Sequence, residues 1–204
     1  MDFLKLVAVN IFLFVSAVAY SQTEDAIIEC FQKSYKLENG GKYAAAIDEL
    51  KKVKADTYMI NVRLGWLSYL AGEYKKATEY YAKAISLRPR SIEARLGYVL
   101  PAAKLKAWKN VGDQYDAILS IDPGNYKANY YRGLMYYNQS NYTKASSYIN
   151  KLEELYPFDY DAVILAAWTT FHLNNKQKAK LLFIQAKTIQ PASESAAEGL
   201  KMCR

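Results

Sequence analysis

Histidine and cysteine are scarce in this chain of 204 residues, which contains one His and two Cys. So few ligands disfavour His- or Cys-based metal centres and redox clusters. The sequence also lacks a glycine-rich phosphate-binding loop and a His-Glu-x-x-His motif. His172 has no Ser or Cys partner at a recognisable motif spacing. We therefore expect no catalytic residues, no metal and no cofactor, and we interpret His172 as a polar residue at the edge of a surface.

Glycine and proline are also few, with 9 Gly and 5 Pro. Turn-rich β structure needs more of both, so their scarcity favours helices, which the abundant Ala, Leu and Lys also favour. Hydrophobic residues make up 51% of the chain, which is enough for a substantial core. Tyrosine is the unusual component, because 19 Tyr stand against 7 Phe and 3 Trp. A structure for this chain has to account for those tyrosines.

The N-terminal segment has the pattern of a targeting signal. Residues 1–5 carry one positive side chain, and an apolar run over 6–18 follows, interrupted only by Asn10 and Ser16. Small residues at 17–19 then offer a cleavage site. We predict a secretory signal peptide over 1–21 and export to the periplasm or the extracellular space. The alternative is an uncleaved membrane anchor, although the apolar run is at the short limit for a spanning helix.

Prolines mark an internal repeat. Pro89, Pro123, Pro157 and Pro191 follow one another at intervals of 34 residues. The clearest copy runs over residues 58–91, with Leu64-Gly65 in a first helix, Gly72-Glu73-Tyr74 at a turn, and then Ala77, Tyr81, Ala84 and Pro89. Small residues at such positions let two helices touch closely, aromatic residues fill the gaps between them, and proline stops the second helix.

At these positions the chain resembles the tetratricopeptide repeat family. The resemblance implies an all-α fold, a right-handed α-solenoid of helix-turn-helix repeats. We predict five repeats within residues 22–193, and a capping helix over 194–204 whose Ala196, Ala197 and Leu200 face the last repeat. The predicted repeats cover residues 27–57, 58–91, 92–125, 126–159 and 160–193.

Two departures from the repeat pattern carry expectations of their own. The interval from Ala46 to Ala77 is three residues short of 34, which we assign to the closing turn of the first repeat. Pro101 falls inside the first helix of the third repeat, where it removes a donor and crowds the carbonyl of Gly97. We expect this helix to bend or break near Leu100, which would give either a hinge or a degenerate repeat.

The family resemblance also implies a binding groove. In tetratricopeptide repeats the first helix of each pair lines the concave surface, and a fixed set of places on it faces the groove. Charged residues are few at these places here. The candidate groove residues are Phe31, Tyr35, Met59, Val62, Trp66, Tyr69, Leu96, Leu100, Tyr130, Leu134, Tyr137, Ile164, Trp168, Phe171 and His172.

An apolar groove predicts an apolar partner. The subgroup of the family that grips acidic chaperone tails uses Lys, Asn and Arg at places that hold Val62, Trp66, Tyr130 and Trp168 here, so such a receptor is disfavoured. We predict a non-catalytic interaction module or scaffold that binds an apolar or amphipathic peptide segment of another exported protein. Two alternatives stay open, because the aromatic residues can serve packing alone, or the groove can be closed by self-association into a homo-oligomer.

Carboxylates suggest no catalytic pair. Glu153-Glu154, Asp159 and Asp161 fall at loop and outward helix positions, and we interpret them as solvating groups. An accessory subunit of an envelope enzyme is the remaining enzymatic alternative. Cys30 and Cys203 lie in the first repeat and in the cap, near opposite ends of the implied solenoid, so we predict no intrachain disulfide.

The basic charge is spread along the chain. The net charge is +7, and the lysines occur in small groups at turns and on second helices rather than on one face. This distribution, together with export, predicts that nucleic acid is not a partner. Weak association with an anionic membrane surface is compatible with it.

Overall fold

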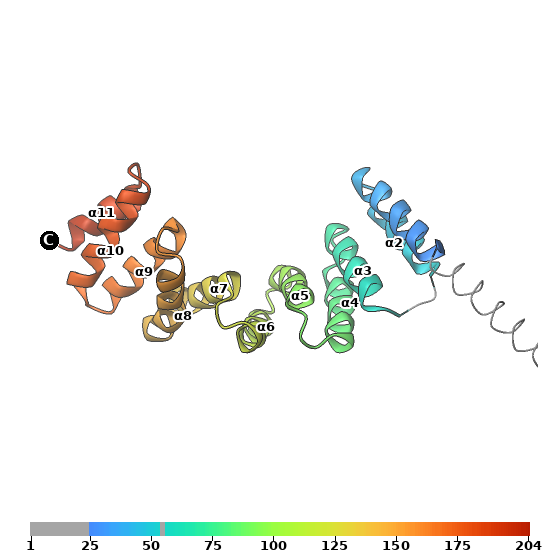
Figure 1. Ribbon diagram of the computed structural model, residues 1–204, viewed down its shortest axis with the longest axis horizontal. Coiled ribbons are helices and arrows are strands. Elements are labelled where there is room, and N and C mark those ends of the chain that lie inside the picture. Colours follow the sequence, from blue (N-terminus) through green and yellow to red (C-terminus); the bar gives the residue numbers. More distant parts are fainter. Residues whose placement is uncertain (1–24, 54–55) are drawn as a thin grey trace, which may run out of the picture. The chain divides into compact units, whose positions relative to one another are not determined.

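The computed structural model describes residues 25–53 and 56–204, and this part of the chain is all-helical, without a strand (Figure 1). The predicted signal peptide over 1–21 lies outside the described residues. Helices pack in consecutive pairs, so the predicted fold class, a tetratricopeptide-like α-solenoid, is confirmed. None of the described helices is both long and apolar enough to cross a bilayer.

Residues 25–39 are helical, and ten further helices follow in the described chain. Their bounds are α2 (Tyr43–Lys51), α3 (Tyr58–Leu70), α4 (Tyr74–Leu87), α5 (Ile92–Lys104), α6 (Trp108–Ile121), α7 (Tyr126–Asn138), α8 (Tyr142–Leu155), α9 (Tyr160–His172), α10 (Lys176–Ile189) and α11 (Glu194–Met202).

The chain divides into two compact units after Leu105. In unit 1, α3 packs against α2, α4 and α5, and α4 also packs against α5. In unit 2, which spans Lys106–Arg204, each helix from α6 to α10 packs against the next one, and α9 also contacts α7 and α11. The division falls inside the third predicted repeat, between its two helices.

The N-caps explain why the first helices start at regular intervals. α3, α5, α7, α9 and α11 each begin after a residue whose side-chain oxygen accepts a hydrogen bond from the backbone N–H three residues later, which satisfies a donor that the helix leaves open. These caps are Thr57, Ser91, Asn125, Asp159 and Ser193, spaced 34 residues apart.

Three of these caps also bond to the tyrosine that begins the preceding repeat. The oxygen–oxygen distances are 2.7 Å for Tyr58–Ser91, Tyr126–Asp159 and Tyr160–Ser193. Asp159 therefore joins two repeats, and its interpretation as a solvating group was wrong, because the sequence alone does not show the hydroxyl that reaches it. Burial and this hydrogen bond raise the pKa of Tyr126.

Replacing Tyr126 by phenylalanine tests this link. Tyr126→Phe keeps the ring but removes the bond to the Asp159 carboxylate, so we expect the free energy of unfolding to fall by about 1–2 kcal/mol. Urea denaturation measures it. Tyr156→Phe is the matched control. Tyr156 is exposed and contacts Tyr126 through its ring, so this change removes a hydroxyl but keeps the ring contact. Equal losses in the two variants would contradict a role for the hydroxyl.

Close contact between neighbouring helices depends on small residues. The Tyr81 ring, 3% exposed, lies between Gly65 on α3 and Gly97 on α5. A Cβ added at Gly97 would stand 2.2 Å from the ring, and one at Gly65 would stand 2.9 Å from it. The absence of a side chain at Gly97 therefore serves the packing of α4 against α5.

The first repeat differs from the others in its second helix. α2 has 9 residues, whereas α4 has 14. The linker from Lys52 to Thr57 is longer than the one between α4 and α5. The expectation of a shortened closing turn was therefore wrong, and the missing residues belong to the end of the helix.

Pro101 does not break its helix. α5 continues through Pro101 to Lys104, and the carbonyl of Pro101 accepts a bond from the N–H of Leu105. Pro101 is buried together with Val99 and Ala102. Their burial in unit 1 offsets the one backbone bond that proline removes, so the expectation of a break near Leu100 was wrong.

The last helix covers the end of α9 and α10. On α11, Ala196 and Gly199 are buried, Ala197 and Leu200 are half-buried, and Glu194 is exposed. A Cβ at Gly199 would stand 2.3 Å from the buried Phe183 ring, so the cap rests on α10 through a glycine. The apolar inner face of α11 thus covers apolar surface of α9 and α10, as capping helices of repeat proteins do.

Candidate binding surface

Aromatic side chains gather where α7 and α9 end and α8 begins. The rings of Tyr142 and His172 stack with their centroids 4.3 Å apart. Tyr137 lies edge-on to both of them, at 5.4 Å from Tyr142 and 5.7 Å from His172. Phe171 meets His172 at 5.7 Å and Trp168 at 5.8 Å. We call these five residues the aromatic cluster of unit 2.

The cluster joins four predicted groove residues from two repeats. Tyr137, Trp168, Phe171 and His172 were candidates, and Tyr142 was not among them. His172 is exposed, and the other rings are half-buried. Each therefore offers part of its surface to a ligand.

The other candidates in unit 2 connect the cluster to the core. Tyr130, Leu134 and Ile164 are half-buried and pack against the core that contains Ile149 and Phe183. Burial raises the pKa of the Tyr130 and Tyr137 hydroxyls, so both stay neutral near neutral pH. These hydroxyls thus add polar but uncharged groups to the surface, while Asp161 lies near Tyr130 and the Lys176 ammonium lies 6.0 Å from the centroid of the Phe171 ring.

Tryptophan side chains in this set are anchored within the protein. The Trp168 indole N–H donates to Ser195 Oγ of α11 at 2.8 Å, and the Trp66 indole N–H donates to Glu38 Oε1 at 2.7 Å. Trp168 also lies edge-on to the buried Phe183, with centroids 4.8 Å apart. Each tryptophan therefore bonds its own repeat to a neighbouring part of the chain. The surface that stays open to a ligand is formed mainly by Tyr137, Phe171 and His172.

In unit 1 a buried arginine holds several candidates in place. Arg63 is 6% exposed and forms an ion pair with Glu38, while its Nε donates to Ser34 Oγ at 3.1 Å. Its guanidinium carbon lies 3.8 Å from the centroid of the Tyr35 ring. Glu38 also accepts the bond from Trp66. Repeat spacing did not predict this network, because Arg63 occupies a place that holds Gly97 in the next first helix of the chain.

The remaining candidates in unit 1 do not form a single cluster with Arg63. Tyr69 contacts Trp66 at 5.8 Å and Tyr74 at 5.8 Å. Phe31 packs against the core of α2 and α3. The aliphatic members are exposed or half-buried: Met59, Val62, Leu96 and Leu100. No predicted groove residue is fully buried.

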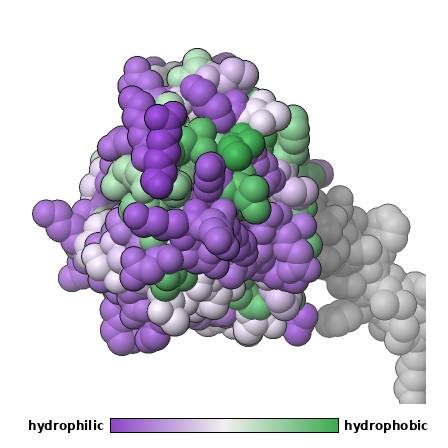
Figure 2. Space-filling model, turned by 90° about the vertical axis from the view of Figure 1, so that its left-hand side faces the viewer, coloured by the Kyte–Doolittle hydropathy of each residue, from purple (hydrophilic) through white to green (hydrophobic). Residues whose placement is uncertain are grey.

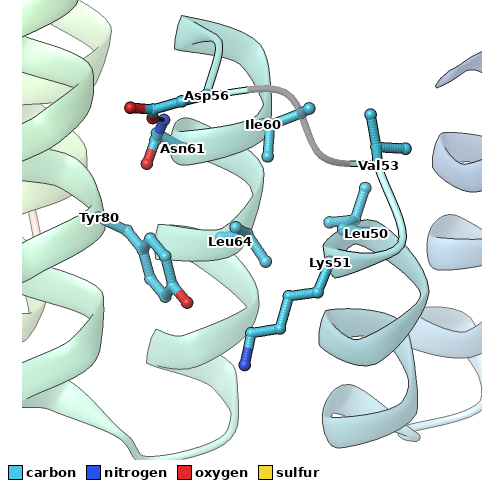
Figure 3. A pocket seen from close by; sticks show the side chains of 8 residues that line it. All are labelled: Leu50, Lys51, Val53, Asp56, Ile60, Asn61, Leu64 and Tyr80. Atoms are coloured by element: carbon cyan, nitrogen blue, oxygen red, sulfur yellow. Dashed lines mark hydrogen bonds between the residues drawn. The ribbon is translucent and has the colours of Figure 1, made fainter. Parts of the chain in front are cut away.

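A pocket in unit 1 was not predicted. It has a volume of about 310 Å³ and lies beyond the end of α2, against α3 and α4. Figure 3 shows Leu50, Val53 and Ile60 on one side of it and Tyr80 and Asn61 on the other. The sequence signal that could have indicated it is the interval from Ala46 to Ala77, which is three residues short of 34 and goes with the early end of α2. Its lining residues are Leu50, Lys51, Val53, Asp56, Ile60, Asn61, Leu64 and Tyr80.

Two polar residues of this pocket, Asp56 and Asn61, bond to each other. Asn61 Nδ2 donates to Asp56 Oδ1 at 2.7 Å, and the Asp56 carboxylate pairs with Lys83 at 2.8 Å. The bonds from Lys83 and Asn61 lower the pKa of Asp56. The pocket therefore presents aliphatic surface, the Tyr80 ring, the Lys51 side chain and a carboxylate whose charge is balanced by Lys83.

Side chains that bind metals or redox partners are dispersed. Among the described residues, no group of three His, Cys, Asp or Glu is placed to hold a metal ion. Cys30 and Cys203 are both free thiols.

Comparison with known families identifies one repeat directly. The family model of the tetratricopeptide repeat matches residues 60–91, which lie within the clearest predicted copy. Sperm-associated antigen 1 of Mus musculus is 26% identical over 136 residues, and the protein of the same name from Rattus norvegicus is 26% identical over 135 residues. The matches cover 66% of this chain but only 15% and 14% of those proteins.

Solved structures extend the likeness to most of the chain. A tetratricopeptide repeat protein from Parabacteroides merdae matches with a TM-score of 0.73 and 21% identity, over 88% of this chain and 72% of that one. MamA matches with a TM-score of 0.71 and 18% identity, over 82% and 93% of the two chains. YrrB, a tetratricopeptide repeat protein with an unusual peptide-binding site, matches with a TM-score of 0.69 and 18% identity, over 92% and 97%. At these identities the likeness establishes the fold.

Proposed function

We propose that this protein is a non-catalytic interaction module that binds an apolar or amphipathic peptide segment of another protein. The observation that carries the proposal is the aromatic cluster of unit 2, in which rings from two repeats form a half-exposed surface on a rigid helical frame. Aromatic residues of this kind dominate the binding energy of protein interfaces.

The fold supports the same proposal. Helical repeats create extended surfaces that their proteins use for binding, and YrrB, with the same fold, has a peptide-binding site. Fold alone does not determine the ligand, so the site must do so. Here the open rings of Tyr137, Phe171 and His172 favour apolar side chains presented at helical or extended spacing.

We further propose that the protein acts outside the cytoplasm, in the periplasm or the extracellular space. The support is the N-terminal sequence, in which a basic residue, an apolar run over 6–18 and small residues at 17–19 follow one another. An N-terminal sequence of the exported protein that begins near Gln22 would test it, and a protein that retains Met1 in the membrane fraction would instead support an anchor.

Peptide selection tests the binding proposal. We expect a displayed library of random peptides to yield apolar or amphipathic ligands, and Phe171→Ser combined with His172→Ala to weaken a selected ligand by about tenfold or more, because truncating an aromatic anchor costs about 2 kcal/mol. Fluorescence anisotropy of the labelled peptide measures the affinity. Leu181→Ser is the control, because Leu181 is exposed on a different helix.

Two outcomes would contradict the proposal. One is an unchanged affinity in the double variant while its thermal midpoint also stays unchanged. The other is sedimentation showing that the cluster is covered by a second copy of the chain, with dissociation to the monomer in the double variant. The second outcome would establish self-association as the function of this surface.

A further inference from the structure

The outer face of α10 differs from that of the other second helices. Leu181 is 67% exposed and Ile184 is 46% exposed, on successive turns of one helix. The corresponding places on the other second helices hold polar or small residues, which is the ordinary composition of an outward face. These residues are Asp48 and Lys51 on α2, Glu79 and Ala82 on α4, Asp113 and Asp116 on α6, and Ser147 and Asn150 on α8.

Lysines flank this pair of aliphatic residues. α10 has the sequence KQKAKLLFIQAKTI, with four Lys and no Asp or Glu. At 3.6 residues per turn, Lys180 lies on one side of Leu181 and Ile184, and Lys178 lies on the other. Within the described chain, no ion pair engages Lys178 or Lys180.

An exposed phenylalanine lies in a loop that is bonded to the same helix. Phe158, in the loop before α9, is 78% exposed. The preceding residue, Pro157, accepts a hydrogen bond from the side-chain amide of Gln185 on α10, so the loop lies against this helix. Figure 2 looks at the end of the molecule that carries α10 and α11 and shows apolar side chains in small patches among hydrophilic ones. We call Phe158, Lys178, Lys180, Leu181 and Ile184 the basic face.

We propose that the basic face binds the surface of an anionic lipid bilayer, which goes beyond the proposed peptide-binding function and uses a different surface. Unpaired lysines attract anionic headgroups, and the aliphatic and aromatic side chains between them enter the interface, as on other amphipathic membrane-bound helices. The lysines pair with the negative charges of the headgroups, and the apolar side chains are buried where the headgroups meet the acyl chains.

The composition of this face favours a bilayer over an acidic protein. Lysine is depleted in protein–protein interfaces, where arginine and large aromatic residues are enriched. α10 contains four Lys and no Arg. Long lysine side chains can reach headgroups while their methylene stems lie along apolar surface, so this helix suits a lipid interface.

Vesicle binding tests the proposal. We expect the chain from residue 22, which keeps every described residue and lacks the apolar N-terminal run, to cosediment with vesicles of phosphatidylglycerol and phosphatidylcholine but not with phosphatidylcholine alone. Added salt should weaken the binding. Lys178→Glu combined with Lys180→Glu should reduce the affinity by about tenfold or more, and Leu181→Ser combined with Ile184→Ser should reduce it as well. The full chain is measured alongside.

The control carries the same change of net charge elsewhere. Lys75→Glu combined with Lys104→Glu alters two exposed lysines of unit 1 and should leave the affinity within about twofold, because neither lysine belongs to the basic face. Circular dichroism confirms that each variant is folded. The groove variant Phe171→Ser with His172→Ala should keep full vesicle binding, which separates this proposal from the peptide-binding one.

Three results would overturn the proposal. They are an absence of binding to anionic vesicles by the chain from residue 22, an equal loss of affinity in the control and in the Lys178 and Lys180 variant, and binding of polyglutamate in place of vesicles. The last result would identify an acidic polypeptide as the partner of the basic face.

Discussion

Replacing Gly97 by alanine is expected to lower the free energy of unfolding by about 2 kcal/mol or more. The new Cβ would stand 2.2 Å from Cε1 and 2.5 Å from Cζ of the Tyr81 ring. Alanine gains about 1 kcal/mol over glycine in helix propensity, which offsets part of a steric cost at the upper end of the range of about 1–3 kcal/mol for overpacked cores. For a chain of this length, the midpoint of thermal unfolding should fall by about 4–8 °C.

The Tyr81 ring has no free space in which to move away from this methyl group. Its opposite edge lies so close to Gly65 that a Cβ there would be 2.9 Å from Cδ2 and Cε2. The ring is 3% exposed, so a shift would also have to displace buried neighbours. The methyl group can therefore be accommodated only if α3, α4 and α5 move apart, which lowers the stability of their packing.

A double-mutant cycle isolates this contact. Tyr81→Leu costs stability by itself, but it removes the ring atoms that an alanine at position 97 would strike. In the Tyr81→Leu background we expect Gly97→Ala to be neutral or stabilising, which chemical denaturation of the four proteins measures. The same cost of Gly97→Ala in both backgrounds would show that its effect does not arise at Tyr81.

A second glycine in unit 2 plays the part of Gly97. Phe183 of α10 meets Gly199 of α11, where an added Cβ would stand 2.3 Å from the ring. At the equivalent place between α6 and α7, the buried Tyr115 instead stacks on Tyr131, with ring centroids 5.9 Å apart. Glycine is therefore needed where the ring is directed at the facing helix backbone, and not opposite every large residue.

The regular parts of the fold could be predicted because their signals are local. Prolines at 34-residue intervals and cap residues such as Ser91 and Ser193 act within a few residues of their own position. α3, α5, α7 and α9 accordingly begin at the first residues of the predicted repeats 58–91, 92–125, 126–159 and 160–193.

The irregular parts depend on contacts between distant residues. The partners Glu38 of Trp66 and Ser195 of Trp168 lie 28 and 27 residues away, on other helices. Sequence spacing placed both tryptophans in the groove but did not show that their indole N–H groups are already bonded. The break expected at Pro101 failed for a similar reason, since local propensity says nothing of the burial that holds α5 together.

Exposure changes which candidate residues are best suited to binding. The two tryptophans stabilise the packing of repeats, so their substitution would affect both stability and binding. Phe171 and His172 offer a cleaner test, because no described hydrogen bond from their rings joins neighbouring repeats and His172 is exposed, although Phe171 also packs against the core of unit 2. The tyrosines divide in the same way, since Tyr126 and Tyr160 join repeats through their hydroxyls while Tyr137 belongs to the cluster.

Replacing Glu38 by alanine is expected to destabilise unit 1 by about 3–5 kcal/mol, because it leaves the buried guanidinium of Arg63 without its counter-charge. The Arg63 side chain is 7% exposed and that of Glu38 is 18% exposed, so solvent screens this pair little. The substitution also removes the acceptor of the Trp66 indole N–H, which adds an unsatisfied polar group. The Tyr35 ring, which lies against the guanidinium, should become more mobile as a result.

A charge-free double variant shows whether Glu38→Ala destabilises unit 1 through the lost ion pair or through the lost side-chain volume. Arg63→Met combined with Glu38→Leu removes both charges and keeps most of the buried volume, so we expect it to recover much of the stability that Glu38→Ala loses. Arg63→Lys should not recover the wild-type value, because lysine lacks the planar group that bonds Ser34 and Glu38 while it lies over Tyr35. Chemical denaturation measures each protein. If the charge-free double variant were as unstable as Glu38→Ala, the buried charge would not be the cause.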